Sequence, residues 1–372
     1  MKKITWTGRT LLGAAAVAGV AALTLTGCSS GTTAGSGDAT GDSSEAIGVS
    51  LIVKTNSNPF FIAMEDGAKA AAEKDGVQLT VAAGKEDGDE DTQIQAIEAA
   101  ISKGDKGILI TPNGPAVLDA IAKARDAGLF VIALDTVPDP ADAVDITFAT
   151  DNFLAGQNIG KWTAGSLDGG DAVIGLIDLF NDKAVSVDYN RDQGFLDGMG
   201  IALNDDKVNG DEAPTGKYTG GKGGSYTIVG NEASEGAEDG GRTAMENLLA
   251  KNPDINVVYT INEPAAYGAY QALEAAGKDP KKVTIVSIDG GCAGVQQVKD
   301  GIIDATSQQY PVKMAELGVE AITKLVKTGE KPSVSDGLDF FNTGVSLVTD
   351  TPVDGVDSID TTKGADSCWG TK

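Results

Sequence analysis

Histidine is absent from this chain of 372 residues. Its absence removes the commonest metal ligand of proteins and the usual general base, including the base of Ser-His-Asp hydrolases. Positive charge is scarce as well, because 29 Lys and Arg residues stand against 54 Asp and Glu, a formal net charge of −25. So acidic a chain is a poor partner for nucleic acid. We therefore expect no metal site, no cofactor and no nucleic-acid partner.

Cysteine is rare, with three residues, and the first of them closes a targeting segment. Three basic side chains lie within the first nine residues, and an apolar, alanine-rich run follows at 11–26. The sequence Leu-Thr-Gly-Cys at 25–28 resembles the lipobox of bacterial lipoproteins, in which the Cys becomes the lipidated first residue. The apolar run is short for a membrane-spanning helix. We predict a lipoprotein signal peptide at 1–27 and a lipid anchor on Cys28 at the outer face of the cell membrane.

A flexible tether is predicted between this anchor and the folded part of the chain. Residues 28–45 are almost entirely Gly, Ser, Thr, Ala and Asp, a composition that cannot bury a core. The two remaining cysteines are Cys292 and Cys368, and two thiols in an exported protein most often form one disulfide. We predict that this disulfide ties the end of the chain to the region near residue 290.

From residue 47 onward, apolar strand-like runs alternate with helix-like segments, and the alternation starts again after residue 150. Continuous apolar strands separated by helices are typical of parallel, doubly wound sheets. We predict an α/β fold of two doubly wound, Rossmann-like lobes. The first half has expected strands at 48–53, 77–82, 107–110, 129–134 and 146–150, with helices at 59–74, 89–103 and 115–127. Later expected strands lie at 172–177, 226–229, 257–260, 283–288, 304–309 and 344–348, with helices at 154–167, 189–203, 236–250, 264–276 and 314–327.

A polar insertion at 204–225 interrupts the second alternation and contains a glycine-rich run at 220–224. A loop that cradles phosphate needs a preceding strand and the order Gly-Lys-Ser/Thr. Neither is present, so we predict a surface loop without a phosphate-binding role.

A short polar segment follows the first strand and opens the first helix. Asn58 is a favoured N-cap, and Pro59 suits the first helical position. Open α/β sheets bind ligands at such strand ends. Lys54 and Asn58 place polar groups beside the rings of Phe60 and Phe61, which suits a small polyol with hydroxyl edges and CH faces. An ordinary cap with two core phenylalanines is the alternative, and Phe61 has the helical spacing of a core residue.

Polar side chains also collect at the carboxyl ends of other predicted strands in both halves of the chain. Asp and Asn commonly begin turns and caps, so each one alone says little, but their joint occurrence favours a binding edge. Arg191 adds a guanidinium group, whose hydrogen-bond donors have a fixed geometry. The alternative, to which we give equal weight, is that Arg191 is a solvent-exposed charge on the face of a helix. The strand-end residues are Asp135, Asp151, Asn152, Asn262, Asp289 and Gln309.

The order of these motifs resembles the ribose/allose/fructose type of periplasmic sugar-binding protein (type I), the solute receptors of ABC importers. The resemblance covers residues 47–349. It is carried by Lys-Thr at 54–55, Ser-Asn-Pro-Phe-Phe at 57–61, Asn-Arg-Asp-Gln-Gly-Phe at 190–195, Ser-Ile-Asp-Gly at 287–290 and Ala-Thr-Ser-Gln-Gln-Tyr-Pro at 305–311.

This resemblance implies two lobes joined by a three-segment hinge, with 46–150 and 310–342 in the first lobe and 151–309 and 343–372 in the second. It also implies a monomer that binds one monosaccharide between the lobes and delivers it to an ABC permease. The ligand-binding residues carried over are Lys54, Asn58, Phe60, Phe61, Asp135, Asp151, Asn152, Arg191, Asn262, Asp289 and Gln309.

Two departures from the family pattern bear on the choice of ligand. The relatives often place an aromatic ring of the second lobe on the other face of the sugar, and residues 230–235 contain none. Lys54, the insertion and the cysteine pair suggest the branch that binds hexoses or hexuloses. Fructose is therefore favoured ahead of ribose or allose.

Two other classes of function are weighed against a transport receptor. An extracytoplasmic enzyme acting on sugars would need one carboxyl group with a strongly raised pKa. The carboxylates here belong to the binding pattern, so we expect no enzymatic activity. A sensory receptor for a sugar or nucleoside, feeding a membrane signalling protein, is the remaining alternative.

Overall fold

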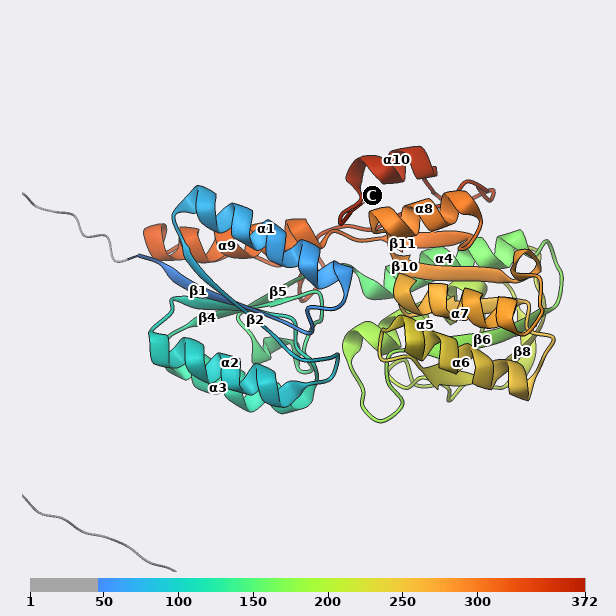
Figure 1. The fold of residues 1–372 in the computed structure, drawn as a ribbon, viewed down its shortest axis with the longest axis horizontal. Coiled ribbons are helices and arrows are strands. Elements are labelled where there is room, and N and C mark those ends of the chain that lie inside the picture. The colour runs from blue at the N-terminus through green and yellow to red at the C-terminus, as the bar shows by residue number, and fades with distance from the viewer. Residues whose placement is uncertain (1–45, 372) are drawn as a thin grey trace, which may run out of the picture. The chain divides into compact units, whose positions relative to one another are not determined.

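The computed structural model describes residues 46–371. The predicted signal peptide, Cys28 and the tether at 28–45 lie outside these residues. Between residues 46 and 371, no helix is both long enough and apolar enough to cross a membrane. The described chain builds two largely parallel sheets, each with helices on both faces (Figure 1).

We call the six-stranded sheet and its helices the first lobe. Its strands follow the order β12-β5-β4-β3-β1-β2, and all neighbours are parallel. Helices α1 and α9 cover one face and α2 and α3 the other (Figure 1). The strands are β1 (Gly48–Val53), β2 (Gln78–Ala83), β3 (Gly107–Ile110), β4 (Phe130–Leu134), β5 (Ile146–Ala149) and β12 (Phe341–Asn342). The helices are α1 (Pro59–Asp75), α2 (Glu90–Lys103), α3 (Leu118–Asp126) and α9 (Pro311–Thr328).

Strand β1 is buried on both faces, as a central strand of a parallel sheet should be. Val49, Leu51 and Val53 belong to the core that contains Met64 of α1, whereas Ile52 belongs to the core beneath α2 and α3. This alternation follows from the two-residue period of a strand. The carboxyl end of β1 then delivers Lys54 to the edge of the sheet.

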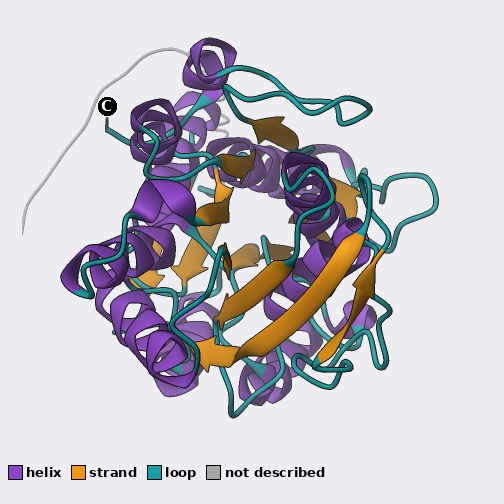
Figure 2. Cartoon of the chain, turned by 90° about the vertical axis from the view of Figure 1, so that its right-hand side faces the viewer, coloured by secondary structure: helices purple, strands orange, loops and turns teal. Residues whose placement is uncertain are grey.

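We call the seven-stranded sheet and its helices the second lobe. Its strands follow the order β13-β11-β10-β9-β6-β8-β7. The two outermost strands run antiparallel to their neighbours, β13 to β11 and β7 to β8. Figure 2 views this lobe end-on, with helices around its strands. The strands are β6 (Ala172–Asp178), β7 (Thr215–Tyr218), β8 (Gly224–Ala233), β9 (Val257–Thr260), β10 (Thr284–Asp289), β11 (Ala305–Gln308) and β13 (Ser346–Val348). The helices are α4 (Asn152–Ser166), α5 (Ser186–Met199), α6 (Glu238–Lys251), α7 (Glu263–Ala275), α8 (Cys292–Asp300) and α10 (Thr361–Ser367).

Helices α4 and α5 pack backbone against backbone through glycines. An added Cβ at Gly194 would lie 2.2 Å from the carbonyl oxygen of Phe153, and one at Gly156 would lie 2.1 Å from that of Arg191. The expected helix at 189–203 is displaced, because α5 starts three residues earlier and ends before Gly200, whose φ of 74° is left-handed.

The expectation of a surface loop at 204–225 is wrong in part. Strand β7 lies inside this segment and extends the sheet by pairing with β8, and the glycine-rich run forms the turn between them. Tyr218 is buried, and its hydroxyl donates to the carbonyl oxygen of Gly170 at 2.6 Å. A polar edge strand exposes most of its side chains, so its sequence lacks the apolar alternation that marks inner strands.

The chain passes three times between the lobes. It leaves the first lobe between β5 and α4, returns between β11 and α9, and leaves again between β12 and β13. The carboxyl ends of β1, β4 and β10 thereby come to lie around one space, which is described below.

The tail, residues 361–371, connects the second lobe to the core of the first. Cys368 forms a disulfide with Cys292 at the start of α8, 76 residues earlier. The next residue, Trp369, packs edge-on to Phe60 of α1 with ring centroids 5.3 Å apart, and it belongs to the first lobe's core. Its indole N–H donates to the carbonyl oxygen of Gln309 at 2.8 Å. Neither α8 nor α10 was expected from the sequence.

Candidate functional site

A small cavity lies where strand ends of both lobes meet, and we call it the inner cavity. Its volume is about 30 Å³, room for about two water molecules. Of the predicted ligand-binding residues, all except Asp151 and Asn152 line it. The lining residues are Lys54, Asn58, Phe60, Phe61, Asp87, Asp135, Leu179, Val187, Arg191, Ile261, Asn262, Asp289 and Gln309.

The start of α1 brings the two phenylalanine rings to this cavity. Asn58 is the N-cap, and its side-chain oxygen accepts the N–H of Phe60 at 2.9 Å. The rings of Phe60 and Phe61 meet edge to face with centroids 5.3 Å apart, and both side chains are buried in the first lobe's core. The two interpretations of this segment are therefore compatible, because the rings are core residues that also form a wall of the cavity.

Lys54 is a buried ammonium group, 3% exposed, at the end of β1. Its Nζ makes no hydrogen bond or ion pair with any residue in the range 46–371. Asp87 lies near it: desolvation raises the pKa of Asp87 to about 6, and the charge of Lys54 acts in the opposite direction. Lys54 thus has unused donors beside the inner cavity.

Asp135 directly follows β4 and has a left-handed backbone with φ of 65°. Its Oδ2 accepts the hydroxyl of Thr136 at 2.9 Å. Its Oδ1 is buried without a hydrogen-bond partner, and the nearest cationic atom is Nη2 of Arg191 at 3.7 Å. A buried acceptor without a donor is costly, so this oxygen suits a ligand hydroxyl group.

Arg191 of α5 lies between carboxylates of both lobes. Its Nη2 is 3.7 Å from Oδ1 of Asp135 in the first lobe, and its Nη1 is 3.9 Å from Oδ1 of Asp289 in the second. Its Nη1 also donates to the carbonyl oxygen of Ile261 at 2.9 Å. The side chain is 4% exposed, so the alternative of a solvent-exposed helix charge is wrong.

Asn152 and Asp151 lie outside the inner cavity and have other partners. Asn152 accepts the Nε–H of Arg191 at 2.8 Å and donates to the carbonyl oxygen of Thr150 at 3.2 Å, so it orients the guanidinium group. Asp151 is the N-cap of α4 and accepts the N–H of Leu154 at 2.9 Å. Asp151 also faces a separate hollow that includes the side chain of Tyr189.

Gln309 connects Asp289 to the first lobe at one of the crossings. Its Nε2 donates to Oδ1 of Asp289 at 2.6 Å, and its Oε1 accepts the hydroxyl of Thr150 at 3.1 Å. Burial raises the pKa of Asp289 to about 7, and the charge of Arg191 opposes this rise. Asn262 caps α7, accepting the N–H of Ala265 at 3.1 Å and donating to Gly236 at 2.9 Å.

Three residues near the site are absent from the predicted ligand-binding set, although Glu263 follows Asn262 at a strand end. Asp87 lies four residues after the end of β2, within an acidic run at 86–91 that does not mark it out from its neighbours. Glu263 is buried on α7, accepts the hydroxyl of Thr306 at 2.8 Å, and has its pKa raised by burial to about 8. Trp369 stands beside Cys368, and only the disulfide places it near α1.

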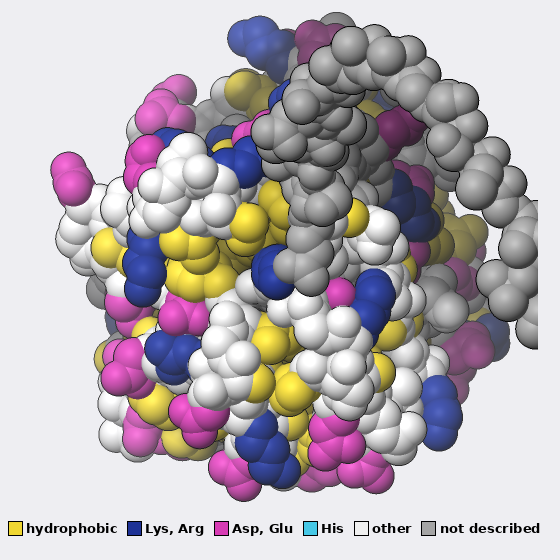
Figure 3. Space-filling model, turned by 90° about the vertical axis from the view of Figure 1, so that its left-hand side faces the viewer, with side chains coloured by type: hydrophobic (Ala, Val, Ile, Leu, Met, Phe, Trp, Pro, Cys, Tyr) yellow, Lys and Arg dark blue, Asp and Glu magenta, His cyan; other side chains and the backbone are white. Residues whose placement is uncertain are grey.

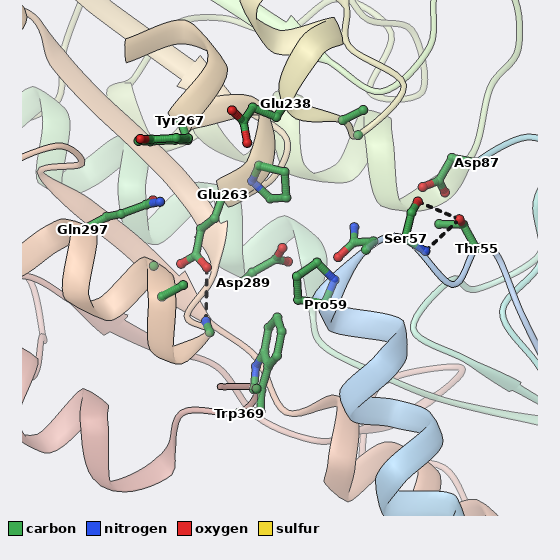
Figure 4. A pocket seen from close by; sticks show the side chains of 18 of the residues that line it. Thr55, Ser57, Pro59, Asp87, Glu238, Glu263, Tyr267, Asp289, Gln297 and Trp369 are labelled. Atoms are coloured by element: carbon green, nitrogen blue, oxygen red, sulfur yellow. Dashed lines mark hydrogen bonds between the residues drawn. The ribbon is translucent and has the colours of Figure 1, made fainter. Parts of the chain in front are cut away.

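A second, wider space adjoins the inner cavity, and we call it the outer chamber (Figure 4). Its volume is about 540 Å³. Asn58, Asp87 and Asp289 line both spaces, so the two are neighbours along the same interlobe cleft.

A model of the periplasmic binding protein domain matches residues 47–331. The chain belongs to the periplasmic binding protein family. The predicted fold of two parallel-sheet lobes, the type I fold of this family, is thereby confirmed. Because the family consists of binding proteins, the expectation that the chain is not an enzyme is also confirmed.

Relatives within the periplasmic binding protein family cover most of the chain. The ribose import binding protein of Salmonella typhimurium is 29% identical over 293 residues, 78% of this chain and 88% of that protein. The D-ribose/D-allose-binding protein of Pseudomonas aeruginosa is 29% identical over 341 residues, 89% of this chain and 97% of its own. An ABC transporter solute-binding protein from Agrobacterium vitis, solved with bound D-fucose, has a TM-score of 0.68 at 26% identity and covers 83% of this chain and 97% of its own.

The lysines and arginines of this family member are dispersed on the side of the first lobe that Figure 3 shows. On the part of that face not covered by grey atoms, they alternate with aspartates and glutamates and form no single basic patch. Such a mixed surface is typical of a soluble domain and differs from the basic stripe that binds nucleic acid.

Proposed function

We propose that the protein is the solute receptor of an ABC importer, which binds one monosaccharide in the inner cavity and delivers it to a permease. The proposal is supported by the relatives, which are named as ribose and D-ribose/D-allose binding proteins. It extends the family membership to a ligand class and a partner.

The observation that carries the proposal is the unpartnered Oδ1 of Asp135 opposite the Arg191 guanidinium group. A carboxylate accepts hydrogen bonds from sugar hydroxyls, whereas Arg191 and Lys54 donate to sugar oxygens. The rings of Phe60 and Phe61 supply an apolar wall for CH groups. Together these groups match the hydroxyl edges and one CH face of a monosaccharide.

The mechanism that follows is closure of a hinge. The inner cavity measures about 30 Å³ in this structure, so the lobes must stand further apart along the three crossings both to admit a sugar ring and to hold it. A ligand then favours the closed state by the contacts that exist only there, including its hydrogen bonds to Asp135 and Asp289 on opposite lobes. A permease that recognises the closed form would receive loaded protein selectively.

The finer parts of the proposal concern the anchor and the sugar. We infer that a lipid on Cys28 and the tether at 28–45 hold a monomeric receptor at the outer face of the membrane. The lobe boundaries that we propose remain 46–150 with 310–342, and 151–309 with 343–372. Lys54 adds a donor that a hexulose such as fructose would use, so we place fructose ahead of ribose and allose.

A thermal-shift screen tests the proposed function. Residues 46–372 are incubated with D-fructose, D-ribose, D-allose, D-fucose and D-glucose, and the unfolding midpoint is recorded. A ligand that binds only the folded state stabilises it by roughly 4 kcal/mol at 1,000 times its Kd. At least one sugar should raise the midpoint, and a panel without any shift would contradict the proposal.

The preference for fructose is tested separately with Lys54→Met, which keeps the length of the side chain and removes its donors. The variant should lose more affinity for fructose than for ribose in calorimetry. An equal loss for both sugars would remove Lys54 from the choice of ligand without affecting the proposed receptor function.

A further inference from the structure

The outer chamber is too large to be only the entrance to a monosaccharide site. Its volume of about 540 Å³ lies within the range of about 300–1,000 Å³ that is typical of small-molecule sites. The inner cavity beside it measures only about 30 Å³. The chamber is therefore much the larger of the two spaces in this structure.

The walls of the outer chamber include apolar faces of the kind that pack against a second ring. Trp369 and Tyr267 line it together with the rings of Pro59 and Pro264. In Figure 4, Tyr267 and Trp369 lie at opposite margins of the space, with Glu263 and Asp289 between them in this view. Tyr267 is half-buried, and its hydroxyl makes no hydrogen bond with the residues that the structure describes.

Polar side chains also line the chamber. Gln297 of α8 is among them, and its amide nitrogen points toward the space in Figure 4. Six carboxyl groups line the chamber, whereas its lining residues include no Lys or Arg. Such a lining accepts hydroxyl donors and opposes a phosphate or carboxylate on the ligand. The six are Glu86, Asp87, Glu235, Glu238, Glu263 and Asp289.

The two spaces share Asn58, Asp87 and Asp289, so a group attached to a sugar in the inner cavity has a direct route outward. We propose that the outer chamber is a second subsite, and that the receptor accepts uncharged glycosides whose second ring packs against Tyr267 and Trp369. This inference rests on the proposed function, because it needs a monosaccharide unit in the inner cavity.

Calorimetry with three matched ligands tests the second subsite. The probes are the monosaccharide with the largest thermal shift, its methyl glycoside and its phenyl glycoside, each in both anomeric forms. One anomer of the phenyl glycoside should bind about two- to twelvefold more tightly than the methyl glycoside, because an aromatic contact adds about 0.5–1.5 kcal/mol. A phosphate ester of the same sugar should bind at least about tenfold more weakly than the sugar itself.

Two variants of Tyr267 test whether the higher affinity of the phenyl glycoside arises from contacts in the outer chamber. Tyr267→Ala keeps a good helix former on α7 and removes the ring, whereas Tyr267→Phe keeps the ring. Tyr267→Ala should abolish the advantage of the phenyl glycoside and leave the affinity for the monosaccharide unchanged. Tyr267→Phe should retain the advantage.

The outcomes separate this inference from the function on which it rests. If the monosaccharide binds and every glycoside is rejected, or if Tyr267→Ala leaves the preference for the phenyl glycoside intact, the second subsite is disproved and the receptor function stands. If neither the monosaccharides nor their glycosides bind, both proposals are overturned.

Discussion

Two groups of buried carboxyl groups lie near α5, and they differ in the charge that faces them. In the inner cavity, Asp135 and Asp289 lie 3.7 and 3.9 Å from the Arg191 guanidinium group. In the second group, Asp178 and Asp192 share the amide of Asn231 at 2.8 and 3.1 Å. Neither Asp178 nor Asp192 has an ion pair with a Lys or Arg of the described chain.

The difference decides which protonation state each group favours. Burial, followed by the neighbouring carboxylates Asp188 and Asp178 respectively, raises the pKa of Asp178 and of Asp192 well above 3.8. Burial raises the pKa of Asp289 as well, but Arg191 holds it to about 7. The charge of Arg191 thus favours the ionised form of Asp289, whereas the neighbouring acids favour the protonated forms of Asp178 and Asp192. Nearby Glu212 accepts the amide of Gln193 and belongs to this second group.

Removal of the Arg191 guanidinium group should have the largest effect on sugar affinity. Arg191→Ala leaves Asp135 and Asp289 as two buried acids without a cationic partner, so sugar affinity should fall by about 3–5 kcal/mol. Calorimetry with the best monosaccharide measures the loss, and Arg191→Lys, which keeps the charge without the fork, is the matched control. Unchanged affinity in Arg191→Ala would show that the two groups of acids do not differ in this way.

Asp135→Asn should have the next largest effect, because it keeps the shape of the side chain and removes the charge and one acceptor. We expect sugar affinity to fall by about 2–3 kcal/mol, since the unpartnered Oδ1 is lost as a charge-assisted acceptor. The matched control is Asp192→Asn in the other group, which should bind sugar like the wild type. Equal losses in both variants would contradict a ligand role confined to the inner cavity.

Asp192→Asn should instead change stability, by a smaller amount. An amide is neutral at every pH, and its N–H groups can donate to the unpartnered Oδ1 of Asp178. At pH 8 the free energy of unfolding should rise by about 1–2 kcal/mol, while at pH 4 it should change little. Urea titrations at the two pH values check this, and destabilisation at pH 8 would argue against a proton-bearing acid at this position.

The smallest effect is the pH dependence of the wild-type protein. Asp178 and Asp192 have folded-state pKa values above the ordinary 3.8, so between those values the folded state binds more protons than the unfolded state. Their contribution to stability is complete below about pH 4 and is lost as the pH rises through the folded-state pKa. Asp289 and Glu263, with pKa values of about 7 and about 8, act in the same direction. The decline in unfolding free energy above pH 4 should be shallower in the double variant Asp178→Asn/Asp192→Asn, and identical slopes would refute the assignment.

The sequence was sufficient to predict the fold and most of the predicted site residues that line the inner cavity. Strands such as β1 and β4 are short continuous apolar runs, and whatever follows them in a parallel sheet lies at one edge. Lys54, Asp135 and Asp289 could therefore be grouped without coordinates. Asp151 follows the same rule but caps α4, because a strand end fixes a position and not the direction of a side chain.

Other features depended on contacts that a linear pattern does not record. Nothing near Asp178 or Asp192 in the sequence indicates that both are buried against each other. Strand β7 escaped notice because its side chains are mostly exposed. Trp369 lies beside Phe60, which is far away in the sequence, and only the path of the tail brings the two together.

The tail gives the two lobes a fourth connection, which differs in kind from the three crossings. The crossings are continuous chain and survive any hinge rotation, whereas the contact of Trp369 with Phe60 must break if α1 and α8 move apart. In the proposed hinge opening, the disulfide would keep the tail on the second lobe, and the indole ring would have to leave Phe60 of the first. Each opening exposes an aromatic surface to water, at a cost of about 2 kcal/mol, and each closure recovers it. The contact of Trp369 with Phe60 would thus add to the stability of the closed form of the proposed hinge, beside the contacts of any ligand.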